Sequence, residues 1–390
     1  MSAFAAVMTG RGMGAIATIQ LIGDAAPAVL ANLLRRAGDQ PLELATGRIF
    51  VGHVVDGDEV IDQVTVGCEG PDTFAIHCHG NPLVVERIVR LSQRNGVELL
   101  TAEEMLTKLL AAQPFSDTIA AEARLALATV KTIAGAEILA HQIESGLSAQ
   151  VTRWRQELDR VPLSQVSAEA QQILRNSEPA RLMISGCTIA LIGPPNTGKS
   201  TLLNTLAGRE KAVVTDIPGT TRDWVSAEIH IPPLAATIID TAGIDPMLSD
   251  GIDRTAQNRS VHILEQVEVV LLVLDVTQSA SQFDRSLADR LTGKRVVTVL
   301  NKSDLPGTLD PASLPAHFSD SVRVSARQGT GIDELIRAIH RVCGLPELDY
   351  QTPVAFTDRQ CKELEQLRGA VSVSEAAGII EELILGQLVV

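Results

Sequence analysis

Eight consecutive residues, Gly193 to Ser200, carry the pattern Gly-x-x-x-x-Gly-Lys-Ser. The preceding stretch 187–192 is apolar and β-branched and predicts a buried strand, while 201–207 favours a helix. Glycines allow the backbone N–H groups to converge on phosphate oxygens at a helix N-terminus. Lys199 would then reach the β- and γ-phosphates, and Ser200 would hold Mg²⁺. The pattern predicts a nucleoside triphosphate site that contains Asn196, Thr197, Gly198, Lys199, Ser200 and Thr201.

The segment Asn301-Lys302-Ser303-Asp304 follows a second apolar strand pattern at 295–300 and indicates which base is bound. A carboxylate at Asp304 accepts hydrogen bonds from both N1–H and the 2-amino group of guanine. Adenine has no such pair of donors, so ATP would leave a buried charge unpaired. The segment therefore predicts GTP and GDP as ligands, with Asn301, Lys302 and Asp304 in the site.

Two further segments complete the expected nucleotide site. Asp240-Thr241-Ala242-Gly243 follows the strand pattern 237–239, so that Asp240 would lie near Mg²⁺ and Gly243 would offer its N–H to the γ-phosphate. After the strand pattern 322–324, a loop is expected to pack on the guanine. Its residues are Ser325, Ala326 and Arg327. The four segments, in this order and at this spacing, predict a GTPase.

A threonine-rich segment at 213–223 lies between the phosphate loop and Asp240. Its spacing favours Thr221 as the residue that closes over the γ-phosphate and gives its hydroxyl to Mg²⁺. Position 244 is Ile, where Ras-like enzymes have a glutamine that orients the attacking water. An aliphatic side chain cannot do this, so another group must orient the water. Arg222 is interpreted either as a catalytic finger acting in trans or as a hydrogen-bonded stabiliser of this segment.

Composition and charge indicate the cellular compartment and exclude some functions. The net charge of −14 argues against non-specific nucleic-acid binding over a broad surface, although not against a local basic patch. Five scattered cysteines without Cys-x-x-Cys spacing predict a reducing, cytoplasmic location and no zinc module. The longest apolar runs are too short to span a membrane. His77 and His79 would point to the opposite face of a strand from Cys78, which favours packing over a metal site.

The chain of 390 residues is long enough for several domains. Residues 1–115 mix strands and helices and predict an α+β domain. Residues 116–182 carry long helical patterns, one of them over 143–158, and end in an expected linker at 176–179. Residues 183–346 alternate strand and helix, which predicts a parallel sheet with helices on both faces. Residues 347–390 are helical again, so the expected fold is an α/β P-loop GTPase domain inserted in a helical domain.

These motifs resemble the tRNA-modifying GTPases of the MnmE family, also called TrmE. The likeness is carried by the phosphate loop, by Thr-Asp-Ile-x-Gly-Thr-Thr-Arg-Asp at 215–223 and by the aliphatic Ile244. It extends to flanking segments that resemble the family's Gly-Arg-Gly, Ile-His-Cys-His-Gly-Gly-Pro and Asn-Glu-Arg-Gln sequences. These are 9–16, 76–82 and 357–360.

The resemblance implies a K⁺-stimulated GTPase and a homodimer, in which the G domains pair across their nucleotide faces and the N-terminal domain dimerises constitutively. It also implies tRNA wobble-uridine (U34) modification with an FAD-containing, MnmG-like partner. The matching switch residues that would surround the nucleotide are Thr215, Asp216, Ile217, Pro218, Gly219, Thr220 and Thr221. Asn196 would hold K⁺ with the backbone carbonyls of Thr215, Ile217 and Thr220. The alternative for Asn196 is an Asx turn that shapes the loop.

The family's water-positioning acid follows the Asp-Thr-Ala-Gly element in a Val-Glu-Arg context, and Asp253 matches it best. Asp253 is one methylene shorter and is displaced by one residue. Its alternative role is that of an acid favoured at a helix N-terminus.

The family's folate chemistry is where the resemblance fails. The last ten residues lack the family's Cys-x-Gly-Lys. In the N-terminal domain, Gln20 stands where the family has an Arg, and Ala75 stands where it has a Glu. A folate tail needs cations and its pterin ring needs a carboxylate. The site for 5-formyltetrahydrofolate is therefore expected to be weak or absent. Two hypotheses remain, an MnmE-like enzyme and a divergent regulatory or assembly GTPase that has lost the modification chemistry.

Overall fold

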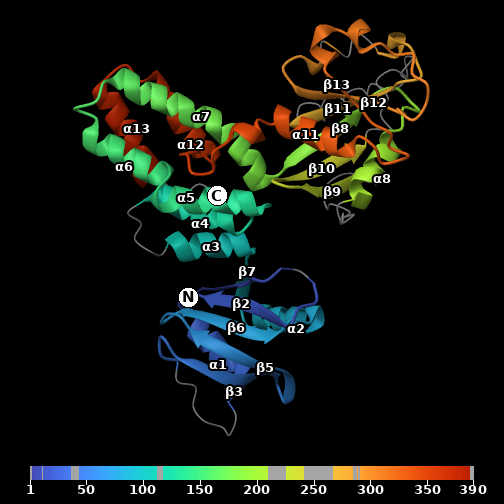
Figure 1. Cartoon of the computed structure of the whole chain (residues 1–390). Coiled ribbons are helices and arrows are strands. Elements are labelled where there is room, and N and C mark those ends of the chain that lie inside the picture. The colour runs from blue at the N-terminus through green and yellow to red at the C-terminus, as the bar shows by residue number, and fades with distance from the viewer. Residues whose placement is uncertain are drawn as a thin grey trace, which may run out of the picture. The chain divides into compact units, whose positions relative to one another are not determined.

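The computed structural model describes residues 2–10, 12–36, 44–111, 117–209, 225–240, 267–283, 288 and 290–386. The chain divides into two compact units, with the division between Phe115 and Ser116 (Figure 1). Each unit has its own buried apolar core.

The N-terminal unit is built on a mixed seven-stranded sheet in the order β3-β4-β5-β6-β2-β1-β7. All neighbouring pairs are antiparallel except β1 and β7, which are parallel. The strands are β1 (Ala3–Val7), β2 (Ile16–Ile22), β3 (Leu34–Arg36), β4 (Ile49–Asp56), β5 (Glu59–Cys68), β6 (Thr73–His79) and β7 (Val97–Leu99). The helices are α1 (Ala26–Leu33), α2 (Pro82–Arg94) and α3 (Ala102–Ala111).

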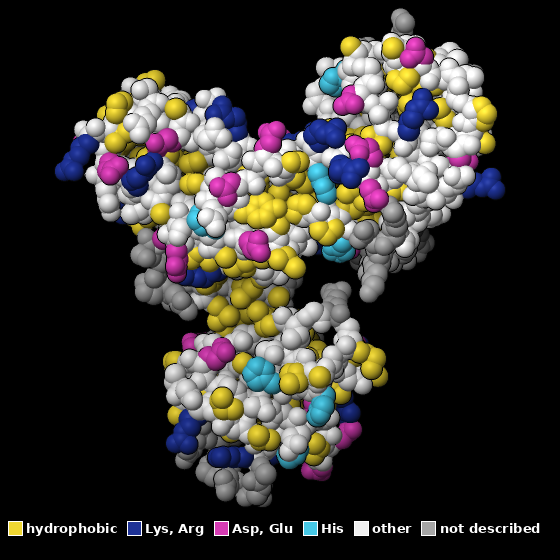
Figure 2. All heavy atoms as spheres, viewed as in Figure 1, with side chains coloured by type: hydrophobic (Ala, Val, Ile, Leu, Met, Phe, Trp, Pro, Cys, Tyr) yellow, Lys and Arg dark blue, Asp and Glu magenta, His cyan; other side chains and the backbone are white. Residues whose placement is uncertain are grey.

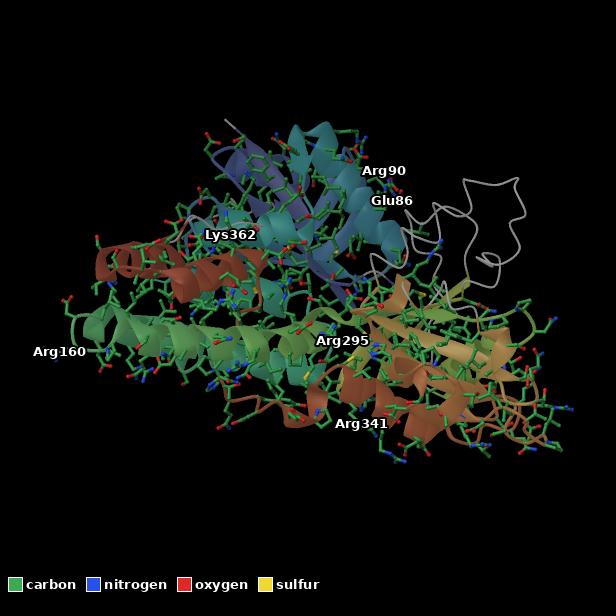
Figure 3. All side chains as sticks on the ribbon, turned by 90° about the horizontal axis from the view of Figure 1, so that it is seen from above. Glu86, Arg90, Arg160, Arg295, Arg341 and Lys362 are labelled. Atoms are coloured by element: carbon green, nitrogen blue, oxygen red, sulfur yellow. The ribbon has the colours of Figure 1, made fainter. Side chains whose placement is uncertain are left out.

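The start of α2 shows how the local sequence positions an element in this unit. The Asn81 side chain accepts a hydrogen bond from the Leu83 N–H at 2.9 Å, and Pro82 occupies the first turn, where its missing N–H costs nothing. Ile88 and Leu91 of α2 are buried in the core. On the exposed side Glu86 and Arg90 form an i, i+4 ion pair (Figure 3). The helix is therefore anchored through one apolar face.

In the second unit, helices from two distant parts of the chain form one bundle. They are α4 (Thr118–Leu127), α5 (Ile133–Glu144), α6 (Leu147–Glu157), α7 (Leu163–Ser185), α12 (Asp358–Gly369) and α13 (Val373–Leu385). α12 packs against α7, while α13 packs against α4 and α6 (Figure 1). The segment between α7 and α12 carries a separate, mostly parallel sheet.

Two expectations for the helical part were wrong. The linker expected at 176–179 lies inside α7, with Pro179 in the helix. The Ser177 hydroxyl donates to the Ile173 carbonyl at 2.6 Å and accepts from the Ala355 N–H at 2.7 Å, so packing against a distant segment stabilises this turn. The helix expected over 143–158 is interrupted between α5 and α6. A Cβ at Gly146 would lie 2.3 Å from Oε1 of Gln142, so a larger residue there would displace the Gln142 side chain.

A buried ion pair joins the two ends of the helical bundle. The Arg359 guanidinium at the start of α12 donates to both carboxylate oxygens of Glu122 on α4, at 2.8 and 2.7 Å. The Gln360 amide donates to the same carboxylate at 2.7 Å. The side chains of Glu122 and Arg359 are 1% and 9% exposed. The segment 357–360, noted above for its family resemblance, therefore has a structural role.

The sheet of the second unit has the strand order β13-β12-β11-β8-β10-β9. It comprises β8 (Cys187–Ile192), β9 (Val225–Ile231), β10 (Leu234–Asp240), β11 (Val269–Asp275), β12 (Arg295–Asn301) and β13 (Ser321–Arg323). All pairs are parallel except β9 with β10. The associated helices are α8 (Lys199–Arg209) and α11 (Ile332–Val342), with short 3₁₀ turns at Ala280–Gln282, Pro311–Ser313, Ala316–Phe318 and Leu345–Glu347.

Alternate residues of β8 enter two different cores. Ile189 and Leu191 belong to the cluster that continues into the helical bundle, while Ala190 and Ile192 belong to a second cluster on the opposite face of the sheet. A strand buried on both faces explains the continuous apolar run in the sequence. Arg295 at the start of β12 forms an ion pair with Glu178 of α7 and so links the sheet to the long helix (Figure 3).

Candidate guanine-nucleotide site

The phosphate loop leaves the carboxyl end of β8 and leads directly into α8. Gly193 and Gly198 have φ angles of 147° and 92°, which side chains rarely adopt. A Cβ at Gly193 would lie 2.1 Å from the Val273 carbonyl oxygen, and one at Gly198 would lie 2.4 Å from Nδ2 of Asn301. Both glycines are therefore required by the backbone and by the close approach of neighbouring strands.

Lys199 is buried and lies against the loop that precedes it. Its ammonium donates to the carbonyl oxygens of Gly193 and Pro194, at 2.7 and 2.8 Å. The Thr197 hydroxyl donates to the Pro194 carbonyl at 3.0 Å. These bonds hold a positive charge inside the loop, where phosphate oxygens are expected to bind.

Ser200 and Asp240 bring two hard oxygen ligands together. The Ser200 hydroxyl in the first turn of α8 donates to Oδ2 of Asp240, the last residue of β10, at 2.6 Å. Hydroxyl and carboxylate oxygens are the ligands that Mg²⁺ prefers, and Mg²⁺ completes its shell with phosphate oxygens and water. These two residues therefore fit Mg²⁺ beside the phosphate loop.

Asn301 connects the phosphate loop with the loop expected to pack on the base. Its buried amide donates to the Thr197 carbonyl at 2.8 Å and accepts from the Ala326 N–H at 3.0 Å. The Thr205 hydroxyl of α8 donates to the Ala326 carbonyl at 2.7 Å. Asn301 thus fixes the phosphate loop and the loop that contains Ala326 relative to each other.

Asp304 is exposed and is oriented by the following loop. The Ser325 hydroxyl donates to Oδ1 of Asp304 at 2.6 Å. This hydrogen bond, with a backbone hydrogen bond and the charge of Arg327, lowers the pKa of Asp304 below its usual value. Asp304 is therefore an ionised acceptor, as recognition of the N1–H and 2-amino group of guanine requires.

Comparison with known proteins decides the family. A family model described as "50S ribosome-binding GTPase" matches residues 188–302. A tRNA modification GTPase MnmE of Enterococcus faecalis is 33% identical over 372 residues, covering 85% of this chain and 79% of that protein. The chain belongs to the MnmE family.

A second relative matches over the same span, and a solved structure matches part of the chain. The Bacillus subtilis MnmE is 31% identical over 377 residues, covering 87% of this chain and 82% of that protein. The G domain of the T. maritima FeoB iron transporter is 25% identical and covers 40% of this chain and 98% of that chain, with a TM-score of 0.33. As a member of the MnmE family with a P-loop GTPase domain, the protein hydrolyses GTP.

Several expected site residues lie outside the residues that the structure describes, and their roles stay predictions. They are Thr215, Asp216, Ile217, Pro218, Gly219, Thr220, Thr221, Thr241, Ala242, Gly243 and Asp253. Within the described part, the structure brings the phosphate loop, Asp240, Asn301 and Ser325 to one edge of the sheet. Thr201 is exposed in the first turn of α8, and its carbonyl accepts from the Thr205 hydroxyl at 2.9 Å.

Sequence reasoning missed Asp275 in this MnmE-family site. Asp275 is the last residue of β11 and accepts a hydrogen bond from the Lys302 ammonium at 2.6 Å. The carboxyl ends of parallel strands meet at one edge, so its place directly after an apolar strand was a usable signal. No short sequence motif surrounds Asp275 to mark it as a site residue.

The histidines and cysteine of β6 do not converge. His77 Nδ1 lies 3.0 Å from the Thr18 hydroxyl, and His79 Nδ1 lies 2.7 Å from Oδ1 of Asp62. Burial raises the pKa of the Cys78 thiol to about 11, with a smaller contribution from Asp62. Among the described residues, no three or more His, Cys, Asp or Glu side chains are grouped to bind a metal ion. Nor does any helix in the described ranges have the length and apolarity needed to cross a membrane.

Proposed function

We propose that this MnmE-family protein is a K⁺-stimulated GTPase whose G domains pair during hydrolysis and which serves tRNA wobble-uridine modification. The proposal that the protein binds a guanine nucleotide rests on two hydrogen bonds. Ser200 bonds to Asp240 at one end of the site, and Ser325 bonds to Asp304 at the other. The curated relatives are named tRNA modification GTPases, which supports the tRNA part. The domain boundaries predicted from the sequence are retained in this proposal.

The proposed chemistry assigns each predicted site residue a separate task. Backbone N–H groups of the loop and the Lys199 ammonium hold the phosphates and stabilise charge that develops on them. Ser200, Asp240 and Thr221 would hold Mg²⁺, which supplies further charge neutralisation when bound. Asp253 would orient the attacking water in place of the glutamine of Ras-like enzymes.

Asn196 is the proposed side-chain ligand for K⁺. It lies at the exposed tip of the phosphate loop with a φ of 64°, a conformation that asparagine tolerates better than most residues. In an Asx turn its side chain would accept from the N–H two residues later, and no such bond forms within the described part of the chain. Its amide oxygen would join the backbone carbonyls of Thr215, Ile217 and Thr220 in a neutral cage.

The K⁺ proposal is tested by measuring GTP turnover in KCl and in NaCl. Turnover by the unmodified protein should be faster in KCl, and Asn196→Ala should remove the difference. Asn204→Ala is the matched control, because Asn204 is exposed on the outside of α8. Equal rates in both salts for the unmodified protein would exclude a K⁺-dependent mechanism. Sedimentation with a transition-state analogue in each salt tests the proposed pairing of G domains.

If Asp253 positions the attacking water, its substitution should change the rate of GTP hydrolysis and not the affinity for GTP. Asp253→Asn should leave GTP affinity nearly unchanged and slow hydrolysis, because the group would contact water rather than the nucleotide. Unchanged turnover would assign Asp253 to the N-terminus of a helix instead.

A second candidate function, a regulatory or assembly GTPase without folate chemistry, is favoured by one feature of the N-terminal unit. Gln20 on β2 lies directly opposite Ala75 on β6, and both residues are buried. The family's expected Arg and Glu match these two facing positions, where this chain has neither charge. Gln20 instead donates to Oε2 of Glu69 at 2.7 Å.

Calorimetry with 5-formyltetrahydrofolate separates the two functions. Heat of binding would support the complete modification chemistry, whereas its absence would support the second candidate.

Capture of an FAD-containing, MnmG-like partner and of tRNA tests the modification pathway directly. On the face shown in Figure 2, Lys and Arg side chains are interspersed with Asp and Glu, so tRNA contact there would depend on local groups. We place the protein in the cytoplasm, in keeping with its five free cysteines.

A further inference from the structure

We propose that Asp275 is a positioning residue for base recognition, which fixes Lys302 and through it the segment Asn301–Asp304. The inference rests on guanine-nucleotide binding at this site, and it is independent of K⁺, dimerisation and tRNA. Asp275 would contact neither nucleotide nor metal, so its effect must pass through Lys302.

Asp275 is buried at the carboxyl edge of the sheet, and its side chain is 3% exposed. It lies opposite Asn301 in the parallel ladder of β11 and β12. Oδ2 accepts from the Lys302 ammonium at 2.6 Å, while Oδ1 accepts from the N–H and hydroxyl of Thr277, at 2.9 and 2.8 Å. Both carboxylate oxygens thus accept hydrogen bonds, and together these bonds fix the orientation of the Asp275 side chain.

The backbone around Asp275 is also held. Oε1 of Gln282 accepts from the Asp275 N–H at 2.9 Å, and Nε2 of Gln282 donates to the Asp275 carbonyl at 2.8 Å. The Val276 N–H donates to the Asn301 carbonyl at 3.0 Å, and the Thr308 N–H donates to the Val276 carbonyl at 2.8 Å. The backbone around Asp275 is therefore hydrogen-bonded to Gln282, to Asn301 of the base-recognition segment and to Thr308 beyond that segment.

Lys302 needs such support. Its φ of 64° is a left-handed conformation that is unfavourable for a side chain of this size. It directly follows Asn301 and is two residues before Asp304, so its conformation decides where Asp304 lies. Burial alone would raise the pKa of Asp275, but hydrogen bonds from Lys302 and Thr277 outweigh burial and lower the pKa. The ion pair is therefore charged and holds Lys302 in its strained conformation.

A buried ion pair that only stabilises the fold would have the same geometry, and a double-mutant cycle separates the two roles. GDP and GTP dissociation constants are measured by fluorescence titration for the unmodified chain, Asp275→Asn, Lys302→Met and the double variant. Asp275→Asn should weaken binding by about tenfold, because a charged hydrogen bond is lost. Lys302→Met should weaken binding by a similar factor, and the double variant should be no weaker than Lys302→Met alone.

Steady-state kinetics provide a second readout. KM for GTP should rise in Asp275→Asn while kcat at saturating GTP stays unchanged, since the phosphate loop and Ser200 are untouched. Asp310→Asn is the matched control. Asp310 is an exposed acid that caps a 3₁₀ turn through the Ala312 N–H at 3.0 Å, and its loss should leave KM unchanged.

The inference is overturned if Asp275→Asn leaves the dissociation constants unchanged, or if its effect is undiminished in the Lys302→Met background. If Asp275→Asn does not fold, Lys302→Met tests the same link from its partly buried partner, and unchanged GDP affinity in that variant would also overturn the inference. Failure of the unmodified chain to bind GDP would instead contradict the nucleotide-binding function itself.

Discussion

Breaking the buried contact between Glu122 and Arg359 should strongly destabilise the helical bundle. Glu122→Gln removes the carboxylate that receives two guanidinium bonds and the Gln360 amide. The amide introduced by this substitution would keep one acceptor oxygen, but its donor would face donors of Arg359 and Gln360. Arg359 would keep its charge without the counter-ion, with that oxygen and the carbonyls of Glu382 and Leu383, at 3.0 and 3.3 Å, as acceptors. Leaving a buried charge without its counter-ion costs about 3–5 kcal/mol.

Thermal unfolding measured by circular dichroism at neutral pH tests this estimate. For a body of this size each kcal/mol lowers Tm by about 2–4 °C, so Glu122→Gln should lower Tm by about 6–20 °C. The matched control is Glu334→Gln on α11, because Glu334 pairs with Arg337 and Arg341 at the surface. The control should leave Tm unchanged. A Glu122→Gln protein that unfolds at the temperature of the control would refute the reasoning.

Three further predictions concern the nucleotide site and the acid stability of the fold. Gly198→Ala should weaken GTP binding by more than about tenfold, because a φ of 92° and the contact with Asn301 exclude a Cβ; Gly208→Ala, with open space around it, is the control in the same titration. Asp304→Asn should weaken GTP binding and favour xanthine nucleotides, since an amide donor suits the 2-oxo group of xanthine; unchanged base preference in a competition assay would contradict this. Burial raises the pKa of Glu169, but hydrogen bonds from Trp154 and other side chains outweigh it and lower the pKa below 4.5. Its contribution to stability should therefore be present above pH 4.5 and lost as the pH falls through the lowered value. Urea unfolding followed by tryptophan fluorescence should find Glu169→Gln less stable than the unmodified protein at about pH 6, with a difference that shrinks as the pH is lowered below 4.5, whereas a difference independent of pH would contradict this assignment.

The phosphate loop and its flanking elements were predictable because their signals are local. An apolar run predicts β8, the two glycines mark the turn between β8 and α8, and Lys199 and Ser200 begin the helix. The same reasoning found the segment at the end of β12, because Asn301 ends and Asp304 follows a strand whose last five residues are buried.

The parts that sequence reasoning missed depend on contacts between distant residues. Ser177 and Pro179 favour a break when taken alone, yet α7 continues through them because Ala355, from a remote segment, bonds to the Ser177 hydroxyl. Asp275 gains its role only when β11 and β12 align in the sheet. Neither contact is visible in a local pattern of residue types.

The most direct test of the nucleotide site is equilibrium binding of labelled GTP and labelled ATP to the full chain with Mg²⁺, in parallel with Lys199→Ala. We predict that the unmodified protein binds GTP and excludes ATP, and that Lys199→Ala binds neither. Binding of ATP as tight as that of GTP, or binding of neither nucleotide by the unmodified protein, would contradict the assignment of Asp304 and of the phosphate loop.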